Sequence, residues 1–509
     1  MTAEIVPLHP KPTIKVIAGE RHHAADQAIA ALMAAKAAIY QRNFAHVSVA
    51  ETAAKNADGV SFQVPGIVKL TLPMLGRGLG QAADFSRYDL RTSKDAWIDP
   101  PTAVAQQILA MVGEWPFPYL SGLIQCPTLR RDGSLLDTSG YDERTGLVLI
   151  NTIDMPPMAT SPSREDAEAA LELLTALLDE FPFADEASRA VALSMIITPV
   201  LRAAMAVAPM HLVTAPVAGT GKSYLADIAA MIATGDRCAV EAMAPSYEET
   251  EKRLVGSALA GFPIIGLDNC RDVIAGDFFC QIVERPLMSL RGLGKSDKHR
   301  VPNTFTMFCN GNNTTVAADM VRRTLRCAMD ANLEHPETRE FAGNPLAAVQ
   351  RNRGQYVAAC LTIARAYISA GRPQPKPPLA SFEGWSQTVR EPLIWLGCAD
   401  PVNTIQALRQ EDPAGNERYQ VFDAWKTAIG INRPAYTSEI IAAAGDNTAF
   451  RDALKHIARQ RFGDAIDPKA FGKWLSANQN NIGAACKLMV DRKDKSRPKW
   501  YLELQGTRK

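Results

Sequence analysis

The sequence predicts an α/β fold with a mostly parallel sheet, preceded by a mixed α+β N-terminal domain and followed by a small C-terminal domain. Residues 210–330 alternate apolar, strand-like runs with helical segments, which is the pattern of a parallel sheet. Residues 1–160 combine an Ala-rich helix over 24–39 with short alternating runs broken by Gly and Pro. Residues 435–509 read as three helices followed by two strands around a charged turn.

The chain divides by composition into five consecutive segments. We expect a mixed N-terminal domain over 1–160, a helical collar over 161–208, an α/β core over 209–375, a helical lid or linker over 376–434 and a C-terminal domain over 435–509. Ser163 with Asp166 forms a capping-box pattern that begins the collar. A Pro-rich stretch at 371–382 ends the core. At 509 residues the chain is long enough for several hydrophobic cores.

Composition excludes several classes of protein. The chain is 47% hydrophobic and 21% charged, which does not fit a disordered chain or a disulfide-dense mini-protein. No run of about 18 apolar residues predicts a membrane span, and residues 1–16 do not read as a signal peptide. The nine cysteines contain no CxxC pair, which favours reduced thiols and no zinc site. We therefore expect a cytoplasmic protein with no membrane partner.

The strongest motif is a phosphate-binding loop. An apolar strand over 210–214 runs into residues 215–223, APVAGTGKS, and a helix begins at once. Glycines let successive backbone N–H groups turn toward phosphate oxygens, and the Lys reaches the terminal phosphates. Pro216 stands where the usual pattern has its first Gly. The alternative is a Gly-rich turn with an incidental lysine, which the strand–loop–helix context disfavours.

A second element follows the apolar run over 262–267, which ends in Asp268 and Asn269. A carboxylate at the end of a strand beside the phosphate-binding loop can help to hold Mg²⁺. Taken alone, such an Asp is more often a turn residue. The sequence thus predicts ATP and Mg²⁺ as cofactors, with Ser223 and Asp268 as metal ligands. The residues expected to bind nucleotide are Pro216, Val217, Ala218, Gly219, Thr220, Gly221, Lys222, Ser223 and Tyr224.

Further catalytic candidates follow a third strand, expected over 304–309. It ends in Asn310-Gly311-Asn312-Asn313, where an amide can orient water or contact the γ-phosphate. We favour Asn312, with Asn310 and Asn313 as rivals, although Asn-Gly is also a common hairpin turn. Arg322 and Arg323 follow, and either could act on the nucleotide of a neighbouring subunit or form surface ion pairs. The catalytic set is Lys222, Asp268, Asn269, Asn312, Arg322 and Arg323.

In this order, the motifs resemble those of superfamily 3-like AAA+ helicases. The closer likeness is to the primase–helicases of bacteriophages and integrative elements, which are related to poxvirus primase-helicases. The resemblance extends to two further segments, WPFPYLSGLIQCPTLRRDGSLLDTSGYDERTGL and RPLMSLRGLGKSDKHRVPNTFTMFCNGNN. A third segment resembles a winged helix and lies near the C-terminus: LKHIARQRFGDAIDPKAFGKWLSANQNNIGAACKLMVDRKDKSRPKWYLEL. The resemblance covers about four fifths of the chain. It implies an AAA+ core over 209–375, a winged-helix domain over 435–509 and a hexameric ring that draws single-stranded DNA through its pore.

The sequence departs from the family at two places. Asn269 occupies the position where many relatives carry a catalytic Glu. Residues 1–150 show no acidic-pair polymerase motif, so a primase activity is not expected from this chain. A primase or polymerase of the same element is then a candidate partner.

Two basic zones are the candidates for DNA contact. Residues 285–300 carry five Lys or Arg and one Asp, and residues 487–509 carry eight basic and three acidic residues, although the whole chain has a net charge of only +1. In the resembling helicases the first zone lines the pore, and we expect a hairpin there. The first zone could instead be a solvated charged loop, and the second could be part of a protein-interaction module. The candidate DNA-binding residues are Arg291, Lys295, Lys298, His299, Lys473, Arg492, Lys493 and Lys495.

The sequence thus favours an ATP-dependent DNA helicase or translocase of a phage or other mobile element. It is expected to act on single-stranded and forked DNA as a self-associated ring, expected to be a homohexamer. The alternative is an ATP-switched DNA-binding replication initiator or regulator that unwinds nothing. A protein-remodelling AAA+ enzyme is disfavoured, because its pore loop usually carries an aromatic residue whereas this tip carries Lys295.

Overall fold

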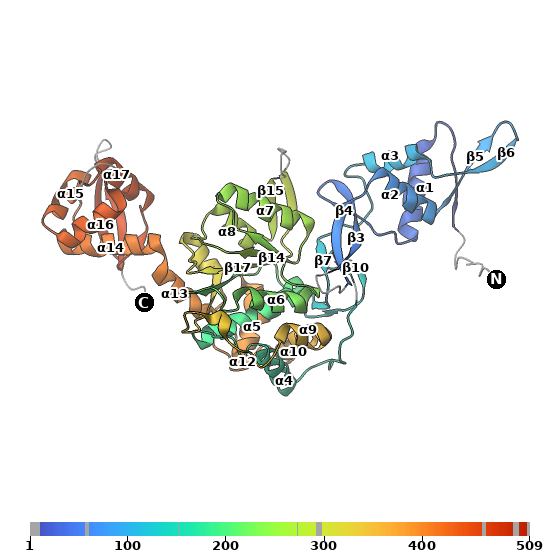
Figure 1. The fold of residues 1–509 in the computed structure, drawn as a ribbon. Coiled ribbons are helices and arrows are strands. Elements are labelled where there is room, and N and C mark those ends of the chain that lie inside the picture. The colour runs from blue at the N-terminus through green and yellow to red at the C-terminus, as the bar shows by residue number, and fades with distance from the viewer. Residues whose placement is uncertain are drawn as a thin grey trace. The chain divides into compact units, whose positions relative to one another are not determined.

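The computed structural model describes residues 11–55, 61–150, 152–271, 273–291, 298–460, 465–491 and 498–505. The chain forms two compact units. Figure 1 labels their helices and strands. The first contains Met1–Arg271, Gln281–Asn312 and Cys327–Pro401, and the second contains Asp272–Cys280, Asn313–Arg326 and Val402–Lys509. Two short segments from the predicted core therefore group with the C-terminal residues.

The first unit begins with the mixed α+β segment that the sequence predicts. Its helices are α1 (Arg21–Ala34), α2 (Leu72–Ala82) and α3 (Thr102–Ala110). One sheet has the order β1-β5-β6, and a second, antiparallel sheet has the order β2-β3-β4. Their strands are β1 (Thr13–Lys15), β2 (Ile39–Arg42), β3 (Ala45–Lys55), β4 (Ser61–Lys69), β5 (Asp84–Asp89) and β6 (Lys94–Ile98). The predicted helix over 24–39 ends at Ala34, because Ile39 already belongs to β2.

Short strands connect this segment to the central sheet. They are β7 (Gly122–Ile124), β8 (Thr128–Leu129), β9 (Leu135–Leu136), β10 (Gly140–Asp142) and β11 (Leu147–Leu149). Strands β8 and β9 form a hairpin, and the other three form a sheet in the order β10-β11-β7. The segment lies close to the residues before β17, since a Cβ on Gly122 would stand 2.7 Å from Thr304 Oγ1.

The central sheet has the order β13-β14-β17-β12-β18, and its first four strands pair in parallel, in line with the predicted mostly parallel sheet. Strand β12 pairs in parallel with β17, β17 with β14, and β14 with β13. The strands are β12 (Met210–Ala215), β13 (Val240–Ala242), β14 (Ile264–Asp268), β17 (Thr306–Asn312) and β18 (Thr324–Ala328). All six residues of β12 are buried, which is typical of a parallel strand covered on both faces. The carboxyl ends of β12, β14 and β17 thus meet at one edge.

Helices and one hairpin complete the first unit. The helices include α4 (Arg164–Ala176), α5 (Glu186–Val200), α6 (Lys222–Thr234), α7 (Tyr247–Ala260), α9 (Pro345–Arg351), α10 (Arg353–Ser369) and α12 (Glu391–Trp395). The capping box of α4 is confirmed: Ser163 Oγ accepts from Asp166 N, and Asp166 Oδ2 accepts from Ser163 N. The hairpin predicted over 285–300 is formed by β15 (Leu287–Arg291) and β16 (Lys298–Pro302), which pair antiparallel.

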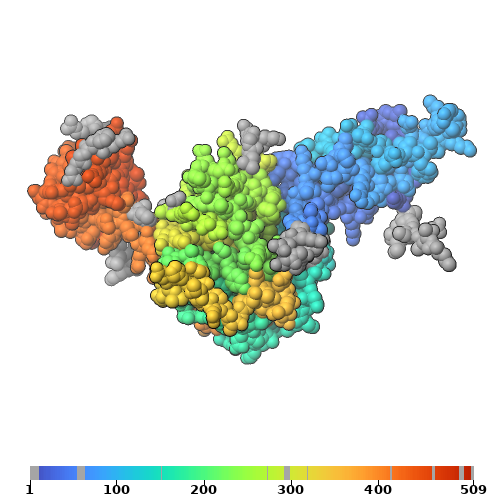
Figure 2. All heavy atoms as spheres, viewed as in Figure 1, coloured from blue at the N-terminus to red at the C-terminus, as the bar shows by residue number. Residues whose placement is uncertain are grey.

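The second unit is built around a separate C-terminal core. Its helices are α13 (Thr404–Glu411), α14 (Pro413–Ala428), α15 (Thr437–Gly445), α16 (Thr448–Ala458) and α17 (Pro468–Ala477), followed by β19 (Ile482–Gly483), β20 (Cys486–Asp491) and β21 (Lys499–Leu504) in one sheet. Trp425, Phe450, Phe471 and Leu502 are buried together. Figure 2 shows the atoms of this C-terminal part of the chain in orange to red. The three helices and two strands predicted over 435–509 are therefore present.

Three global expectations can be compared with the structure. No helix in the described residues is both long and apolar enough to span a bilayer. All nine cysteines lie in the described part, and none of them forms a disulfide there. No cluster of three or more His, Cys, Asp or Glu suited to a metal ion occurs among the described residues.

Candidate nucleotide-binding site and basic surfaces

The phosphate-binding loop joins the buried strand β12 to α6 at the carboxyl edge of the sheet. Helix α6 begins at Lys222, and Gly235 ends it with a left-handed conformation. Gly219 and Gly221 have φ angles of +78° and +96°, which side chains rarely tolerate. A Cβ on Gly219 would also stand 3.0 Å from the backbone N of Glu337. Both glycines are thus required by the path of the loop.

Lys222 lies folded across this loop. Its Nζ donates to Val217 O at 3.0 Å and to Thr220 Oγ1 at 3.2 Å. Burial lowers the pKa of Lys222, and the negative charge of Asp268 partly opposes that shift. The ammonium group is therefore held at the loop, within electrostatic reach of the carboxylate that ends β14.

Asn310 connects three elements of the site. Its Nδ2 donates to Ser223 Oγ at 3.3 Å, and its Oδ1 accepts from Asn269 N at 3.3 Å. Asn269 N also donates to Asp268 Oδ1 at 2.7 Å, in a turn where Asn269 has a φ of +54°. Asn310 itself is only 5% exposed. One buried amide thus joins the start of α6 to the turn after β14.

The other asparagines are placed differently. Strand β17 extends through Asn312 rather than ending at Cys309, and Asn310-Gly311 lies inside a parallel strand, so the hairpin-turn alternative is wrong. Asn312 pairs with Ala215 at the end of β12 and is exposed, and Asn313 has a φ of +52°. Among the three, the structure brings Asn310 to Ser223. The sequence favoured Asn312 for a different contact, with the attacking water or the γ-phosphate, and that preference stays a prediction.

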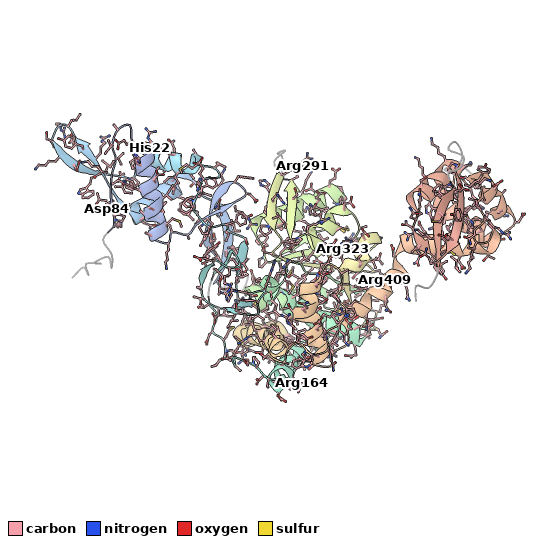
Figure 3. All side chains as sticks on the ribbon, turned by 180° about the vertical axis from the view of Figure 1, so that it is seen from behind. His22, Asp84, Arg164, Arg291, Arg323 and Arg409 are labelled. Carbon is pink, nitrogen blue, oxygen red and sulfur yellow. The ribbon has the colours of Figure 1, made fainter. Side chains whose placement is uncertain are left out.

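The paired arginines lie in the second unit, on the 3-10 segment η2 (Ala318–Arg323). Arg323, labelled in Figure 3, is 4% exposed and its guanidinium donates to Asp319 O. Arg322 is partly exposed. The two residues are therefore not equivalent, and Arg323 has a structural role in fixing η2.

A cavity of about 410 Å³ opens beside the loop, and most of its wall lies outside the predicted motifs. The rings of Phe181 and Tyr224 stack with centroids 6.2 Å apart, and Tyr224 OH donates to Asn344 Oδ1 at 2.9 Å. The guanidinium of Arg339 lies 5.0 Å from the ring centroid of Phe341. Tyr224 was predicted to bind nucleotide. The others come from segments 180–182 and 337–345, which carry no spacing pattern that the sequence could reveal.

The β15–β16 hairpin has one basic face and one apolar face. Arg291 pairs with Lys298, and Ser289 with Arg300, so the exposed Arg291, Lys298 and Arg300 share a face (Arg291 is labelled in Figure 3). His299 pairs with Leu290, on the side where Met288, Leu290 and Val301 are buried. Strand alternation thus places His299 away from the basic face and adds Arg300 to it. Lys295 lies outside the described residues.

The C-terminal candidates are only partly described. Lys473 is exposed on α17, one helical turn from the exposed Lys469. Arg492, Lys493 and Lys495 lie outside the described residues. They belong to the turn that the sequence predicts between β20 and β21. These two strands pair antiparallel through six residue pairs.

Comparisons with known proteins give distant structural similarities. No protein-family model matches the sequence, and no curated protein matches it. Among solved structures, the chain is similar to the apo A form of the NrS-1 C-terminal region, with 13% identity, 84% of this chain and 98% of that chain covered and a TM-score of 0.35. It is similar to the SCCmec type IV Cch active helicase, with 11% identity, 84% and 95% covered and a TM-score of 0.32. It is also similar to JCV helicase bound to a small molecule, with 13% identity, 53% and 73% covered and a TM-score of 0.19.

Proposed function

We propose that this chain is an ATP-dependent DNA helicase or translocase of a phage or other mobile genetic element. It would act on single-stranded and forked DNA as a ring, expected to be a homohexamer. Asn310 carries most weight in this proposal, because it links the phosphate-binding loop to the Asp268–Asn269 turn. If residues 215–223 were only a Gly-rich turn with an incidental lysine, the fold would not need a buried side chain that joins this segment to the turn after β14.

The residues at this edge suit a magnesium nucleotide. Backbone N–H groups of 217–222 and the Lys222 ammonium are donors for phosphate oxygens. The Ser223 hydroxyl and the Asp268 carboxylate are oxygen ligands of the type that Mg²⁺ prefers, and they would hold the ion. When bound, the ion would neutralise charge on the phosphates. The aromatic wall of Phe181 and Tyr224 would take the adenine base.

Residues of two subunits would complete catalysis. Asn310, or Asn269 beside it, would orient the attacking water, because the described turn carries no Glu at this position. Arg322 would stabilise charge on the nucleotide of a neighbouring subunit, because Arg323 is buried and holds η2. Hydrolysis would therefore depend on ring assembly.

Two basic surfaces would bind DNA. The face formed by Arg291, Lys298 and Arg300 would contact the backbone of a single strand, together with Lys295. The C-terminal domain, a winged helix in this proposal, would place Lys473, Arg492, Lys493 and Lys495 near a fork or origin. Such contacts to phosphate are independent of sequence and depend strongly on salt.

Asn269 favours one alternative, an ATP-switched initiator or regulator that does not unwind DNA. An amide cannot act as a general base, so hydrolysis could be slow enough for ATP to serve mainly as an assembly signal. Strand displacement on forked DNA separates the two functions. Measurable ATP-dependent unwinding supports the helicase, and ring assembly without unwinding supports the switch.

The nucleotide site is tested with Lys222→Ala. This variant is expected to lose ATPase activity and unwinding while keeping its circular-dichroism spectrum. Lys252→Ala, an exposed change on α7 of the same type, is the matched control. Wild-type turnover by Lys222→Ala would overturn the assignment.

A further inference from the structure

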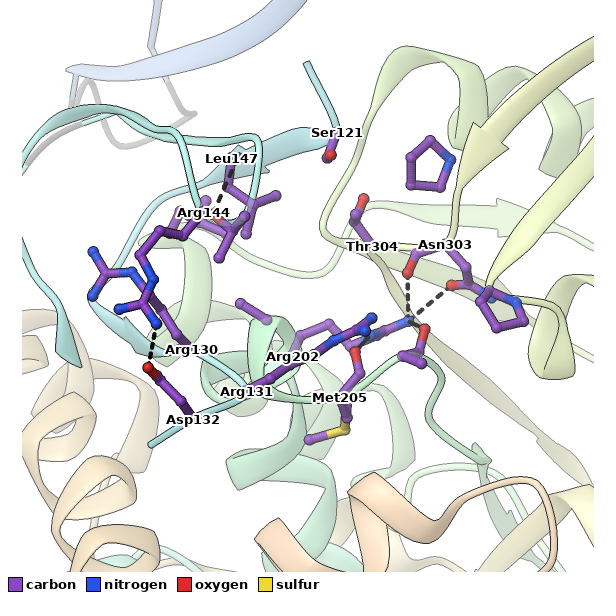
Figure 4. Close-up of a pocket in the computed structure, with 16 residues that line it drawn as sticks. Ser121, Arg130, Arg131, Asp132, Arg144, Leu147, Arg202, Met205, Asn303 and Thr304 are labelled. Carbon is purple, nitrogen blue, oxygen red and sulfur yellow. Dashed lines mark hydrogen bonds and ion pairs between the residues drawn. The ribbon is translucent and has the colours of Figure 1, made fainter. Parts of the chain in front are cut away.

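A second cavity, of about 430 Å³, lies between the connecting strands β7–β11 and the base of the β15–β16 hairpin (Figure 4). Its lining includes four arginines and one aspartate: Arg130, Arg131, Arg144, Arg202 and Asp132. Pro286, Pro302, Asn303 and Thr304 contribute the wall at the hairpin base. None of these residues belongs to the nucleotide site.

Arg202 is the buried cation of this wall. It is 4% exposed and follows α5, and its guanidinium donates to the carbonyl oxygens of Phe305, Met205, Ala206 and Asn303. These partners are neutral, so its positive charge is not cancelled by a carboxylate among the described residues. Burial, and to a smaller extent the charge of Arg131, lowers the pKa of Arg202 to about 9. Because the cavity wall carries a positive charge that no carboxylate of the described residues cancels, it favours the binding of an anion in the cavity.

The other arginines differ in how they are paired. Arg130 is paired with Asp142 at 2.7 Å, and Arg144 is paired with Asp132. Arg131 stands at the tip of the β8–β9 turn, is exposed, and forms no hydrogen bond or ion pair within the described chain. Its planar fork is therefore available to an incoming group, and this geometry suits phosphate.

The wall of the cavity includes the end of strand β16, which carries part of the basic face. Along β16, residues 298, 300 and 302 share one face, and Pro302 is part of the cavity wall. The hairpin is tied to Arg202 through Asn303, whose Oδ1 accepts from Arg202 Nη2 at 3.0 Å. A row of exposed cations at Lys298 and Arg300 thus leads to the cavity. A polyanion can follow that row, whereas a single small anion needs only the cavity.

We propose that this cavity, which we name the Arg131 pocket, binds a phosphodiester of single-stranded DNA that continues from the hairpin. Arg131 would contact the phosphate directly, and Arg202 would supply fixed positive charge behind it. The apolar side chains of Pro286, Pro302 and Met205 offer a surface for the adjoining base or sugar. The volume admits about one nucleotide and no duplex. This inference rests on the DNA binding in the proposed function and extends it to a site outside the hairpin.

The test is Arg131→Glu in the full chain, measured by the anisotropy of a fluorescent oligothymidylate over a range of salt concentrations. Charge reversal at a phosphate contact is expected to weaken binding about tenfold and to reduce the slope of log K against log salt by about 0.7. Arg131→Lys should recover most of the affinity. Arg87→Glu, an exposed charge reversal on β5, is the matched control, and ATPase activity without DNA should be unchanged in every variant.

Two results would overturn the inference. One is unchanged oligonucleotide affinity and salt slope in Arg131→Glu. The other is loss of binding to inorganic phosphate or a mononucleotide with retention of oligonucleotide affinity, which would identify a small-anion site. If the proposed function itself is wrong, the wild-type protein would bind the oligonucleotide only weakly. Its affinity would then be unchanged both in the hairpin variants and in Arg131→Glu.

Discussion

The side chain of Asn310 donates to Ser223 Oγ at 3.3 Å, although the two residues stand on different elements of the sheet edge. Ser223 lies in the first turn of α6, and Asn310 is a buried residue of β17. The same amide accepts from Asn269 N. One side chain thus contacts both the first turn of α6 and the turn after β14.

Asn310→Ala is therefore expected to reduce ATP turnover by about 100-fold or more, because it removes an amide that positions both the hydroxyl of Ser223 and the turn. Steady-state hydrolysis with DNA present measures this. Asn312→Ala removes an exposed amide from the same strand and is the matched control, with a much smaller effect expected. If the two variants ranked in the opposite order, Asn312 would be the residue that contacts the nucleotide.

Gly219→Ala should abolish nucleotide binding. The left-handed backbone costs about 1–2 kcal/mol for a residue with a Cβ, and that Cβ would also stand 3.0 Å from the backbone N of Glu337. The loop must then move from its position. Titration with a fluorescent ATP analogue measures the loss. Gly397→Ala is the control for backbone strain. Gly397 also has a positive φ, +91°, but an added Cβ would meet no atom within 4 Å, so this variant adds strain without a steric contact. Equal effects of both variants on nucleotide affinity would contradict this account.

Charge reversal on the basic face of the hairpin should weaken DNA binding in a salt-dependent manner. Lys298→Glu with Arg300→Glu is expected to lower affinity for single-stranded DNA at least tenfold near physiological salt and much less at high salt. His299→Gln lies between these positions but on the opposite face, so it should leave the affinity nearly unchanged. A loss in His299→Gln equal to that of the charge reversals would argue against the facial assignment.

Local patterns predicted much of the fold. The Ser163–Asp166 capping box and the two C-terminal strands around a charged turn depend on neighbouring residues, and the structure contains both. The parallel order of the sheet also follows from alternating strands and helices. Boundaries were less predictable: the end of β17 is set by pairing with β12, which extends the strand to Asn312.

The contacts that join distant segments could not be predicted. Phe181 and Phe341 reach the cavity beside the phosphate-binding loop from positions separated by 160 residues, and no motif marks either one. The face on which His299 lies could not be predicted either, because its orientation depends on the register of β15 and β16. The run of basic residues was enough to identify 285–300 as a candidate DNA-binding segment. Which of its side chains face outward depends on the alternation of side chains along the two paired strands.

A buried histidine makes the first unit sensitive to acid. His46 is 3% exposed, its ring centroid lies 3.7 Å from that of Trp115, and neither ring nitrogen has a hydrogen-bond partner within the described residues. Burial lowers the pKa of His46 from 6.5 to about 4. Between these two values the unfolded chain binds a proton that the native state excludes. Stability therefore falls as the pH drops below about 6.5, and this loss levels off below about 4.

Replacing His46 by Leu should remove this dependence. Between pH 7 and pH 5 the wild-type protein is expected to lose about 2 kcal/mol of stability through His46 alone, and His46→Leu should lose correspondingly less. Urea unfolding at both pH values gives the difference. His211, buried with its pKa lowered to about 3, remains in both proteins and contributes equally. His22→Leu, at an exposed position, is the control. The same pH dependence in His46→Leu and wild type would mean that the imidazole gains solvent or a partner before the chain unfolds.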